Sequence, residues 1–349
     1  MFGNKKNISL ALIISMVLCM FLFSACEKKE KKDIKISRNG FFLDTFIDIS
    51  LYDTTDEKLL DGCFEILKDI ENKMSRHDKD SEISKINNKA GKSYTKVSDD
   101  VYYVIKKSLE FSNLSNGNFD ITIGKLASLW NIGNKDAKVP SKEDIQEALK
   151  YINYKDIKIK ENTNMVKLDK KDMIIDLGGI AKGYASDKIK NYLQSKNIKR
   201  AIINLGGNIC VIGEKSNNTP WNIGIQNPFN NRGDYLGVLK VKNKSVITSG
   251  IYERFLEYKG KKYHHILSPF DGYPIQNELV SVSIISYDGI DCDALSTSLF
   301  ALGKDKGLKL ANELKNIDAI FVTKDKQIYL TDDIKDKFIL NEDSFNVAN

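Results

Sequence analysis

Helical and strand patterns are segregated along this chain of 349 residues. Apolar residues recur at helical spacing within 54–75, 97–117 and 141–152, as expected of amphipathic helices. A strand-like segment at 40–52 precedes them, and short β-branched runs dominate from about residue 157. The chain lacks the regular β-α-β alternation of a doubly wound fold. This order predicts an α+β fold with a mixed or antiparallel sheet and flanking helices.

The N-terminus has the features of an export signal. Lys5 and Lys6 precede an apolar run at 8–23, which is shorter than the roughly 20 residues that a spanning helix needs. Small residues then lead to Cys26 in the sequence FSAC, which resembles the lipobox of bacterial lipoproteins. We therefore interpret residues 1–25 as a lipoprotein signal peptide and Cys26 as the lipidated first residue of the mature chain. An uncleaved membrane anchor is the alternative.

The domain organisation follows from the residues after Cys26. The highly charged stretch 26–38 is interpreted as a solvated tether between lipid and domain. No Pro/Gly-rich linker interrupts residues 36–345, so we expect residues 39–345 to form a single unit. Both interpretations of the N-terminus place this unit outside the cytoplasm and attach it to a membrane.

Composition excludes several classes of function. The net charge of +6 is modest for this length, and no nucleic-acid-binding motif occurs, so we expect no nucleic-acid partner. Cys63, Cys210 and Cys292 follow Cys26 as an odd set without CxxC spacing. A disulfide framework or a zinc site is therefore not expected.

The segment DMIIDLGGIAKGYASDKI, residues 172–189, leads from an apolar strand into a helix. It contains three glycines within six residues: Gly178, Gly179 and Gly183. Glycine at such density indicates a sharp turn or a close approach of another group. The free amides of a helix N-terminus attract anions, and Asp176 and Lys182 flank the turn. A tight strand-to-helix connection without a ligand is the alternative, because neither the dinucleotide fingerprint nor the P-loop pattern is present.

Three further groups of residues could carry chemistry. Asp293 and Thr297 are spaced i, i+4, so both lie on one helix face. A carboxylate and a hydroxyl suit a hard cation such as Mg²⁺, although an N-capping Asp and a buried Thr would show the same spacing. His264 and His265 are adjacent in a predicted strand, so their side chains should point to opposite faces. His77 lies in a polar loop.

Taken in order, these segments resemble the successive motifs of the FAD:protein FMN transferase (ApbE-type) family, formerly called thiamine biosynthesis lipoproteins. The resemblance covers roughly residues 40–330, and its most specific blocks are DLGGIAKGYA and DALST. The other matching segments are DTF, MSRHDKDSEISKIN, FDITIGKLASLW, INLGGNICVIG, SGIYERF and HHILSPFDGYP. Export as a lipoprotein also fits this family.

The resemblance implies a reaction. Members split FAD at its pyrophosphate and attach the FMN half to a Thr or Ser hydroxyl of an acceptor protein, with Mg²⁺ as cofactor and AMP as leaving group. Acceptors are typically subunits of membrane redox complexes. Two alternatives remain: a pyrophosphatase that uses water as acceptor, and a flavin-binding lipoprotein. The latter class usually has two doubly wound lobes, which this pattern does not predict.

The resemblance also implies a set of site residues. The residues that would line the FAD site are Leu43, His77, Asn118, Phe119, Asp120, Asp176, Lys182, His265 and Leu267. Mg²⁺ would bind Asp293, Thr297 and the carbonyl of Gly179, and either His265 or an acidic metal neighbour such as Asp293 would accept the proton of the acceptor hydroxyl. Ser268 stands where the family pattern has Asp, and His77 stands where an aromatic residue is common.

Overall fold

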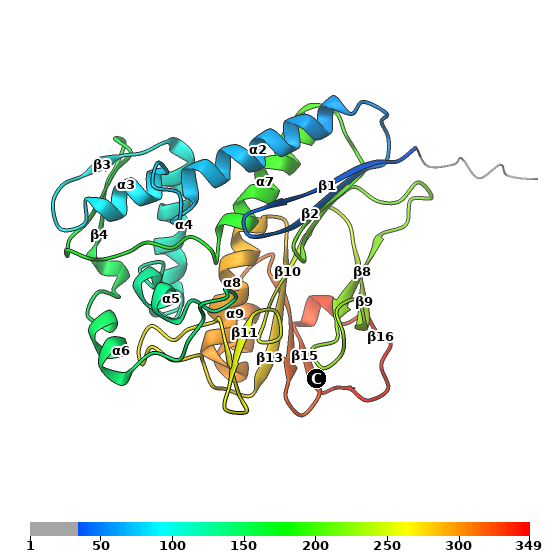
Figure 1. Ribbon diagram of the computed structural model, residues 1–349. Helices are drawn as coiled ribbons and strands as arrows, with labels where there is room; N and C mark the ends of the chain where they lie inside the picture. Colours follow the sequence, from blue (N-terminus) through cyan, green and yellow to red (C-terminus); the bar gives the residue numbers. More distant parts are fainter. Residues whose placement is uncertain (1–33) are drawn as a thin grey trace, which may run out of the picture. The chain divides into compact units, whose positions relative to one another are not determined.

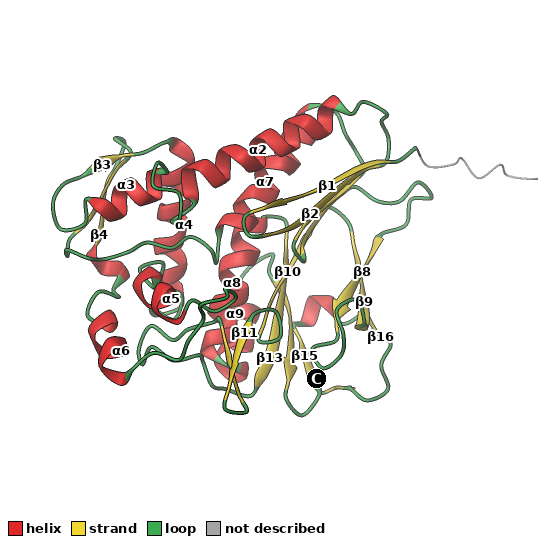
Figure 2. Ribbon diagram, viewed as in Figure 1, coloured by secondary structure: helices red, strands yellow, loops and turns green. Residues whose placement is uncertain are grey.

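The chain is built on a nine-stranded sheet that carries helices on one face and a smaller sheet on the other (Figures 1 and 2). The computed structural model describes residues 34–349. The predicted signal peptide, Cys26 and most of the predicted tether lie outside the described residues. Lys35–Asn349 forms a compact unit, and β1 begins at Ile36, three residues before the predicted start of the domain.

The large sheet has the order β1-β2-β6-β7-β10-β13-β14-β15-β17. Neighbouring strands are antiparallel except β15 and β17, which are parallel. The strands are β1 (Ile36–Phe42), β2 (Thr45–Leu51), β6 (Ala201–Leu205), β7 (Asn208–Ile212), β10 (Ser245–Gly250), β13 (Leu279–Ser286), β14 (Asp318–Thr323), β15 (Gln327–Leu330) and β17 (Asn346–Val347). The predicted mixed sheet with flanking helices is thereby confirmed.

Three smaller sheets and eight α-helices complete the described part of the chain. The small sheets are β8 (Trp221–Gln226), β9 (Tyr235–Val241) and β16 (Phe338–Leu340); β11 (Phe255–Tyr258) and β12 (Lys261–His264); and β3 (Thr95–Lys96), β4 (Ile157–Lys160) and β5 (Met165–Leu168). The helices are α2 (Lys58–Met74), α3 (Glu82–Asn88), α4 (Asp99–Leu114), α5 (Gly124–Trp130), α6 (Lys142–Leu149), α7 (Ala181–Ser195), α8 (Gly289–Leu302) and α9 (Lys304–Glu313). None of these helices is long and apolar enough to cross a bilayer.

Side chains alternate between the two faces of the large sheet, so the sheet contributes to two separate hydrophobic cores. Ile47 and Ile49 of β2 are buried in the core formed with the helices, on the side where α2, α7 and α8 lie in Figure 1. Val211 and Val246 are buried in the second core, together with Trp221 of the small β8-β9-β16 sheet. Because successive side chains point to opposite faces, one sheet can serve both layers.

Two strand predictions were wrong. The single strand expected at 40–52 is a hairpin, β1-β2, whose turn residues Leu43 and Asp44 have φ of 51° and 56°. Leucine and aspartate carry little of the Asn-Gly signal typical of such two-residue turns, so the alternation concealed the reversal. The strand expected before the glycines does not join the large sheet. It is an extended segment that makes only an isolated bridge, between Ile174 and Ile123.

Candidate active site

Two extended segments run side by side and place their motifs next to each other. The amide of Asp176 donates to the carbonyl of Ile121 (2.8 Å), and the amide of Gly124 donates to the carbonyl of Ile174 (3.1 Å). The first segment contains the predicted Phe119 and Asp120, and the second leads into the glycine turn. Residues more than 50 positions apart in sequence thus share one edge of the site.

The three glycines before and within α7 serve different purposes. None of them has a positive φ, so a sharp left-handed turn is not the reason for their presence. A Cβ on Gly183 would lie 2.3 Å from the carbonyl oxygen of Gly289, so this glycine permits α7 and α8 to cross closely. A Cβ on Gly179 would lie 3.2 Å from the ring of Phe119 and 3.9 Å from Thr297 Oγ1. Gly179 therefore lies beside two predicted site residues.

Asp293 is the centre of this cluster. Its side chain is buried, and its Oδ2 accepts a hydrogen bond from the amide of Gly183 (2.9 Å). Its Oδ1 accepts from Asn208 Nδ2 (3.0 Å) and lies 3.7 Å from the ammonium of Lys182. Helices α7 and α8 and the start of β7 therefore converge on one carboxylate. Sequence reasoning missed Asn208, although it lies in the INLGGN segment.

Thr297 lies one helical turn beyond Asp293. Its hydroxyl is 3.2 Å from the hydroxyl of Ser249 on β10, which also contacts Ser296 (2.8 Å). The oxygen atoms in this cluster that could act as metal ligands belong to a carboxylate, to hydroxyls and to backbone carbonyls. Such oxygens are the ligands that a hard cation prefers. No group of three His, Cys, Asp or Glu side chains suited to a metal occurs among residues 34–349. An all-oxygen set of this kind is the one that Mg²⁺ prefers.

Asp176 is oriented by a residue that sequence reasoning missed. Its carboxylate forms an ion pair with Arg76 (2.7 Å) and accepts a hydrogen bond from the amide of Gly178 (2.8 Å). Arg76 precedes His77, whose exposed ring makes no hydrogen bond or ion pair within the described chain. The ion pair between Arg76 and Asp176 therefore holds the loop that contains His77 next to the glycine turn.

Asp120 has a structural part in the site. Its Oδ1 accepts from the amide and hydroxyl of Thr122, and its Oδ2 accepts from the amide of Tyr154. Burial raises the pKa of Asp120 above its ordinary value, although these hydrogen bonds oppose the shift. The residue also lines a cavity of about 400 Å³, together with Tyr154 and Phe270. Asn118 lies beside this cavity, with its amide bound to the carbonyl of Ser115 (2.8 Å).

The two adjacent histidines point to different environments, as predicted. His264 is buried, and its Nε2 lies 2.9 Å from the carbonyl of Ile275. His265 is exposed, and its Nδ1 lies 3.2 Å from the carbonyl of Arg254. Although part of the residue faces solvent, the surrounding protein desolvates its ring and lowers the pKa of His265, and the positive charges of Arg254 and Lys182 lower it further. His265 and Lys182 are thus electrostatic neighbours.

Arg254 connects the histidine to the hairpin tip. Its guanidinium donates to the carbonyl of Asp44 (2.7 Å), next to the predicted Leu43, whose amide donates to Glu71 (2.8 Å). Arg254 lies in the quoted SGIYERF segment, but nothing in the sequence indicated this contact. Arg254 therefore links His265 to the turn of the β1-β2 hairpin.

The loop after His265 departs from the family pattern without losing its turn. The hydroxyl of Ser268 accepts hydrogen bonds from the amides of Phe270 and Asp271 (3.3 Å each). Leu267 pairs with Pro274 in an isolated bridge and packs against the small core around Trp130. Ser268 therefore organises the turn and supplies no carboxylate to the site.

Comparisons with known proteins agree with this geometry. A family model described as the ApbE family matches residues 43–321. A FAD:protein FMN transferase of Klebsiella pneumoniae (strain 342) is 39% identical over 276 residues, which cover 79% of this chain and 85% of that protein. One from Treponema pallidum (strain Nichols) is 34% identical over 291 residues and covers 80% of each.

Solved structures give the same result. The ApbE protein of Thermotoga maritima superimposes with a TM-score of 0.80 at 34% identity, covering 87% of this chain and 99% of that one. The flavin transferase ApbE from Vibrio cholerae superimposes with a TM-score of 0.77 at 25% identity, with the same coverage. The resemblance noted in the sequence is thereby confirmed. The matched family model, the identities above 30% and the shared fold show that this chain belongs to the ApbE family.

Proposed function

We propose that this protein is an FAD:protein FMN transferase that attaches the FMN half of FAD to a Thr or Ser hydroxyl of an acceptor protein and releases AMP, with Mg²⁺ as cofactor. Family membership and the named relatives support flavin transfer. The observation that carries the rest is the convergence of Gly179, Lys182, Asp293 and Thr297 at one helix crossing. A carboxylate, a hydroxyl and a cation at one point suit a pyrophosphate with its metal.

Each residue of this cluster has a proposed role. Asp293, Thr297 and the carbonyl of Gly179 would hold Mg²⁺, which when bound would neutralise charge on the pyrophosphate. Lys182 would contact a phosphate oxygen from the same side, because its ammonium lies 3.7 Å from Asp293 and 3.3 Å from the carbonyl of Gly178. Asn208 and the amide of Gly183 hold the Asp293 carboxylate in place.

FAD would extend from this cluster along the predicted lining. The residues proposed to line its site are Leu43, His77, Asn118, Phe119, Asp120, Asp176, Lys182, His265 and Leu267. Asp176 is fixed for this purpose by Arg76 and Gly178. Asp120 would shape the site by holding its loop, because both of its oxygens are already bound.

Transfer requires a proton acceptor for the attacking hydroxyl. Its oxygen forms a bond to the phosphorus of the FMN half while the bond to the AMP oxygen breaks, and the hydroxyl proton must leave. His265 suits this role because its Nδ1 faces the carbonyl of Arg254 and must carry the ring proton, which leaves Nε2 as a base. The lowered pKa keeps the ring neutral near pH 7. A carboxylate of the metal site, Asp293, is the alternative.

The cellular setting rests on the sequence. A lipidated Cys26 would anchor the enzyme outside the cytoplasm, with subunits of membrane redox complexes as acceptors. The FSAC sequence and the apolar run before it support this proposal.

One assay tests the function. Purified protein is incubated with FAD, Mg²⁺ and a candidate acceptor, and acceptor mass, AMP and free FMN are measured. We expect acceptor-bound FMN and one AMP per transfer. Free FMN with AMP would identify a pyrophosphatase instead, and FAD binding without AMP would identify a binding protein.

A further inference from the structure

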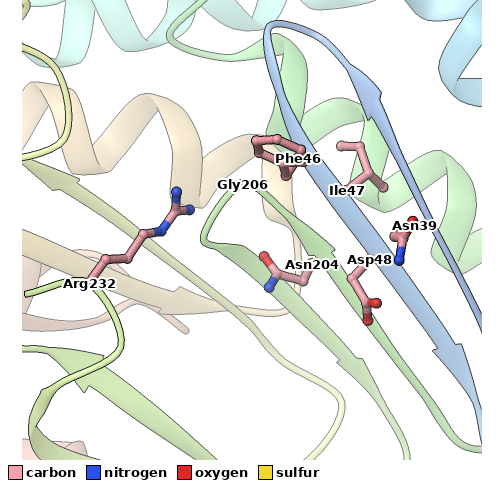
Figure 3. Close-up of a pocket in the computed structure, with 7 residues that line it drawn as sticks. All are labelled: Asn39, Phe46, Ile47, Asp48, Asn204, Gly206 and Arg232. Carbon is pink, nitrogen blue, oxygen red and sulfur yellow. The ribbon is translucent and has the colours of Figure 1, made fainter.

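A second cavity lies on the sheet face that points away from the helices. It has a volume of about 330 Å³ and lies between strands β1, β2 and β6 and the loop that joins β8 to β9 (Figure 3). Asn39, Asp48 and Asn204 form a row across three neighbouring strands, because Asn39 pairs with Asp48 and Asp48 pairs with Asn204. Arg232 reaches toward this row from the loop (Figure 3).

Arg232 has a side chain that is unpaired within the described chain, and hydrogen bonds hold the backbone on both sides of it. It makes no ion pair or side-chain hydrogen bond with any residue in 34–349. Its two neighbours are both bound by one side chain, since Gln226 donates to the carbonyl of Asn231 (3.0 Å) and accepts from the amide of Gly233 (3.1 Å). The loop backbone is thus held on both sides of Arg232, and the guanidinium stays exposed and, in the part of the chain that the structure describes, unpaired.

The cavity is separated from the proposed metal site by one turn of chain. Gly206 lines the cavity, and Asn208, two residues later, donates to Asp293. Asn204 fixes this turn by accepting the amide of Gly207 (2.8 Å). A Cβ on Gly207 would meet no atom within 4 Å, so the outer side of the turn is open.

An apolar rim completes the cavity at the hairpin end. Phe41 and Phe46 pair across β1 and β2 with their rings edge to face, and they are 60% and 72% exposed. Phe46 also lines the cavity, two residues along β2 from Asp48. Exposed aromatic pairs next to polar groups are typical of protein-binding surfaces.

We propose that this cavity, bounded by Asn39, Phe46, Asp48, Asn204, Gly206 and Arg232, is the docking site for the acceptor polypeptide that receives FMN. The inference rests on the proposed function. Asp48 and Arg232 carry opposite charges, and the amides of Asn39 and Asn204 lie on either side of Asp48. This lining matches a chain that carries both donors and acceptors. A phosphate or nucleotide fits less well, because its negative charge would face Asp48 as well as Arg232. A polypeptide can place an acidic side chain at Arg232 and amide donors at Asp48. Arg232 selects an acidic residue near the modified Thr or Ser.

The test uses a pool of synthetic peptides, each with one Thr or Ser and randomised flanking residues, together with FAD and Mg²⁺. Sequencing of the FMN-labelled peptides gives the preferred flanks, and calorimetry gives the FAD affinity. We expect the wild-type protein to favour acidic flanks. Arg232→Ala should raise KM for such peptides roughly three- to tenfold, and Arg232→Glu should favour Lys or Arg instead. FAD affinity should stay unchanged in both.

Arg38→Ala is the matched control. Arg38 lies on β1 next to Asn39 but points to the other face, where it pairs with Asp61, so its loss should leave the flank preference intact. Identical preferences and KM values in wild type, Arg232→Ala and Arg232→Glu would overturn the docking site. Weaker FAD binding by Arg232→Ala would assign the cavity to FAD and would also overturn it. If the wild type labels no more peptide than Asp293→Ala, the proposed function itself fails.

Discussion

At the residue scale, Asp293 combines a proposed chemical role with a structural one. Replacing it with Ala should remove a metal ligand and lower kcat by about 10²–10³, the effect of losing one strong electrostatic contact in the transition state. It should also destabilise the fold by about 1–3 kcal/mol, because the buried amide of Gly183 and the side chain of Asn208 lose their acceptor. FAD turnover and a thermal melt measure the two effects. Near-wild-type Mg²⁺-dependent turnover would contradict the metal assignment.

Gly179 and Gly183 form a natural pair for comparison. Gly179→Ala should fold normally, because its Cβ meets only the edge of the Phe119 ring at 3.2 Å and Thr297 at 3.9 Å. Gly183→Ala should destabilise by about 3 kcal/mol or more, since its Cβ would lie 2.3 Å from the carbonyl oxygen of Gly289. Thermal melts of the two alanine variants measure this difference. The bulkier Gly179→Val should strongly impair FAD turnover. Equal melting of the two alanine variants would show that the helix crossing adapts easily.

The pH dependence follows from His265. A pKa below the ordinary value, caused first by desolvation, means that the folded protein keeps the neutral base to lower pH. The acid limb of kcat/KM should therefore lie below about pH 6.5, and His265→Gln should lower kcat and remove that limb. His264→Gln, which changes the neighbour that faces Ile275, should retain it. An unchanged limb in His265→Gln would assign the base to another group.

At the element scale, the site depends on how α7 meets α8. Asp187 of α7 accepts hydrogen bonds from the amides of Gly289 and Ile290 (2.8 Å each) and pairs with Lys190 (2.9 Å), whose side chain is buried. The start of α8 is thereby fixed to the middle of α7, and Asp293 to its beginning. Two contacts between the same helices set the position of the proposed metal ligands.

Removing Asp187 should loosen this crossing. Asp187→Ala removes the acceptor of two α8 amides. It also leaves the buried Lys190 ammonium with the Tyr287 carbonyl (2.5 Å) and the more distant Asp288 carboxylate (3.9 Å). We therefore expect a loss of about 3 kcal/mol in unfolding free energy and a higher Mg²⁺ requirement for turnover. Lys188→Ala is the control, because its ion pair with Asp100 is 42% exposed on the lysine side and should be worth at most about 1 kcal/mol. A thermal melt and a Mg²⁺ titration test this. Similar effects of the two variants would argue against the crossing as the critical element.

The sequence predicts features that depend on neighbouring residues better than contacts between distant segments. Periodicity located the amphipathic helices, because this signal is local. Contiguous motifs led to the prediction of Asp176, Lys182 and Asp293 as site residues, and the structure gathers them around the glycine turn. The partners Asn208 and Arg76 were missed because they come from segments 85 and 100 positions away along the chain, and pairing across such separations leaves no local pattern.

At the scale of the whole molecule, the proposed anchor limits where the enzyme can act. Nine residues, 27–35, separate Cys26 from Ile36 at the start of β1, and a fully extended chain from Cys26 to Ile36 spans at most roughly 35 Å. An acylated Cys26 would therefore keep the catalytic unit close to the membrane. Acceptor hydroxyls within that distance of the bilayer would be modified in preference to those of freely diffusing proteins.

Lipidation of Cys26 is the proposed attachment of the catalytic unit to the membrane. Cys26→Ser should abolish acylation and slow or block signal cleavage, because the modified cysteine defines the cleavage position of a lipoprotein signal. The measurements are detergent-phase partitioning and the mass of the mature protein. A chain beginning at Lys35, where the compact unit starts, should still transfer FMN to acceptor in solution but should no longer partition with detergent. Unchanged partitioning and mass in Cys26→Ser would show that the apolar run at 8–23 is an uncleaved anchor.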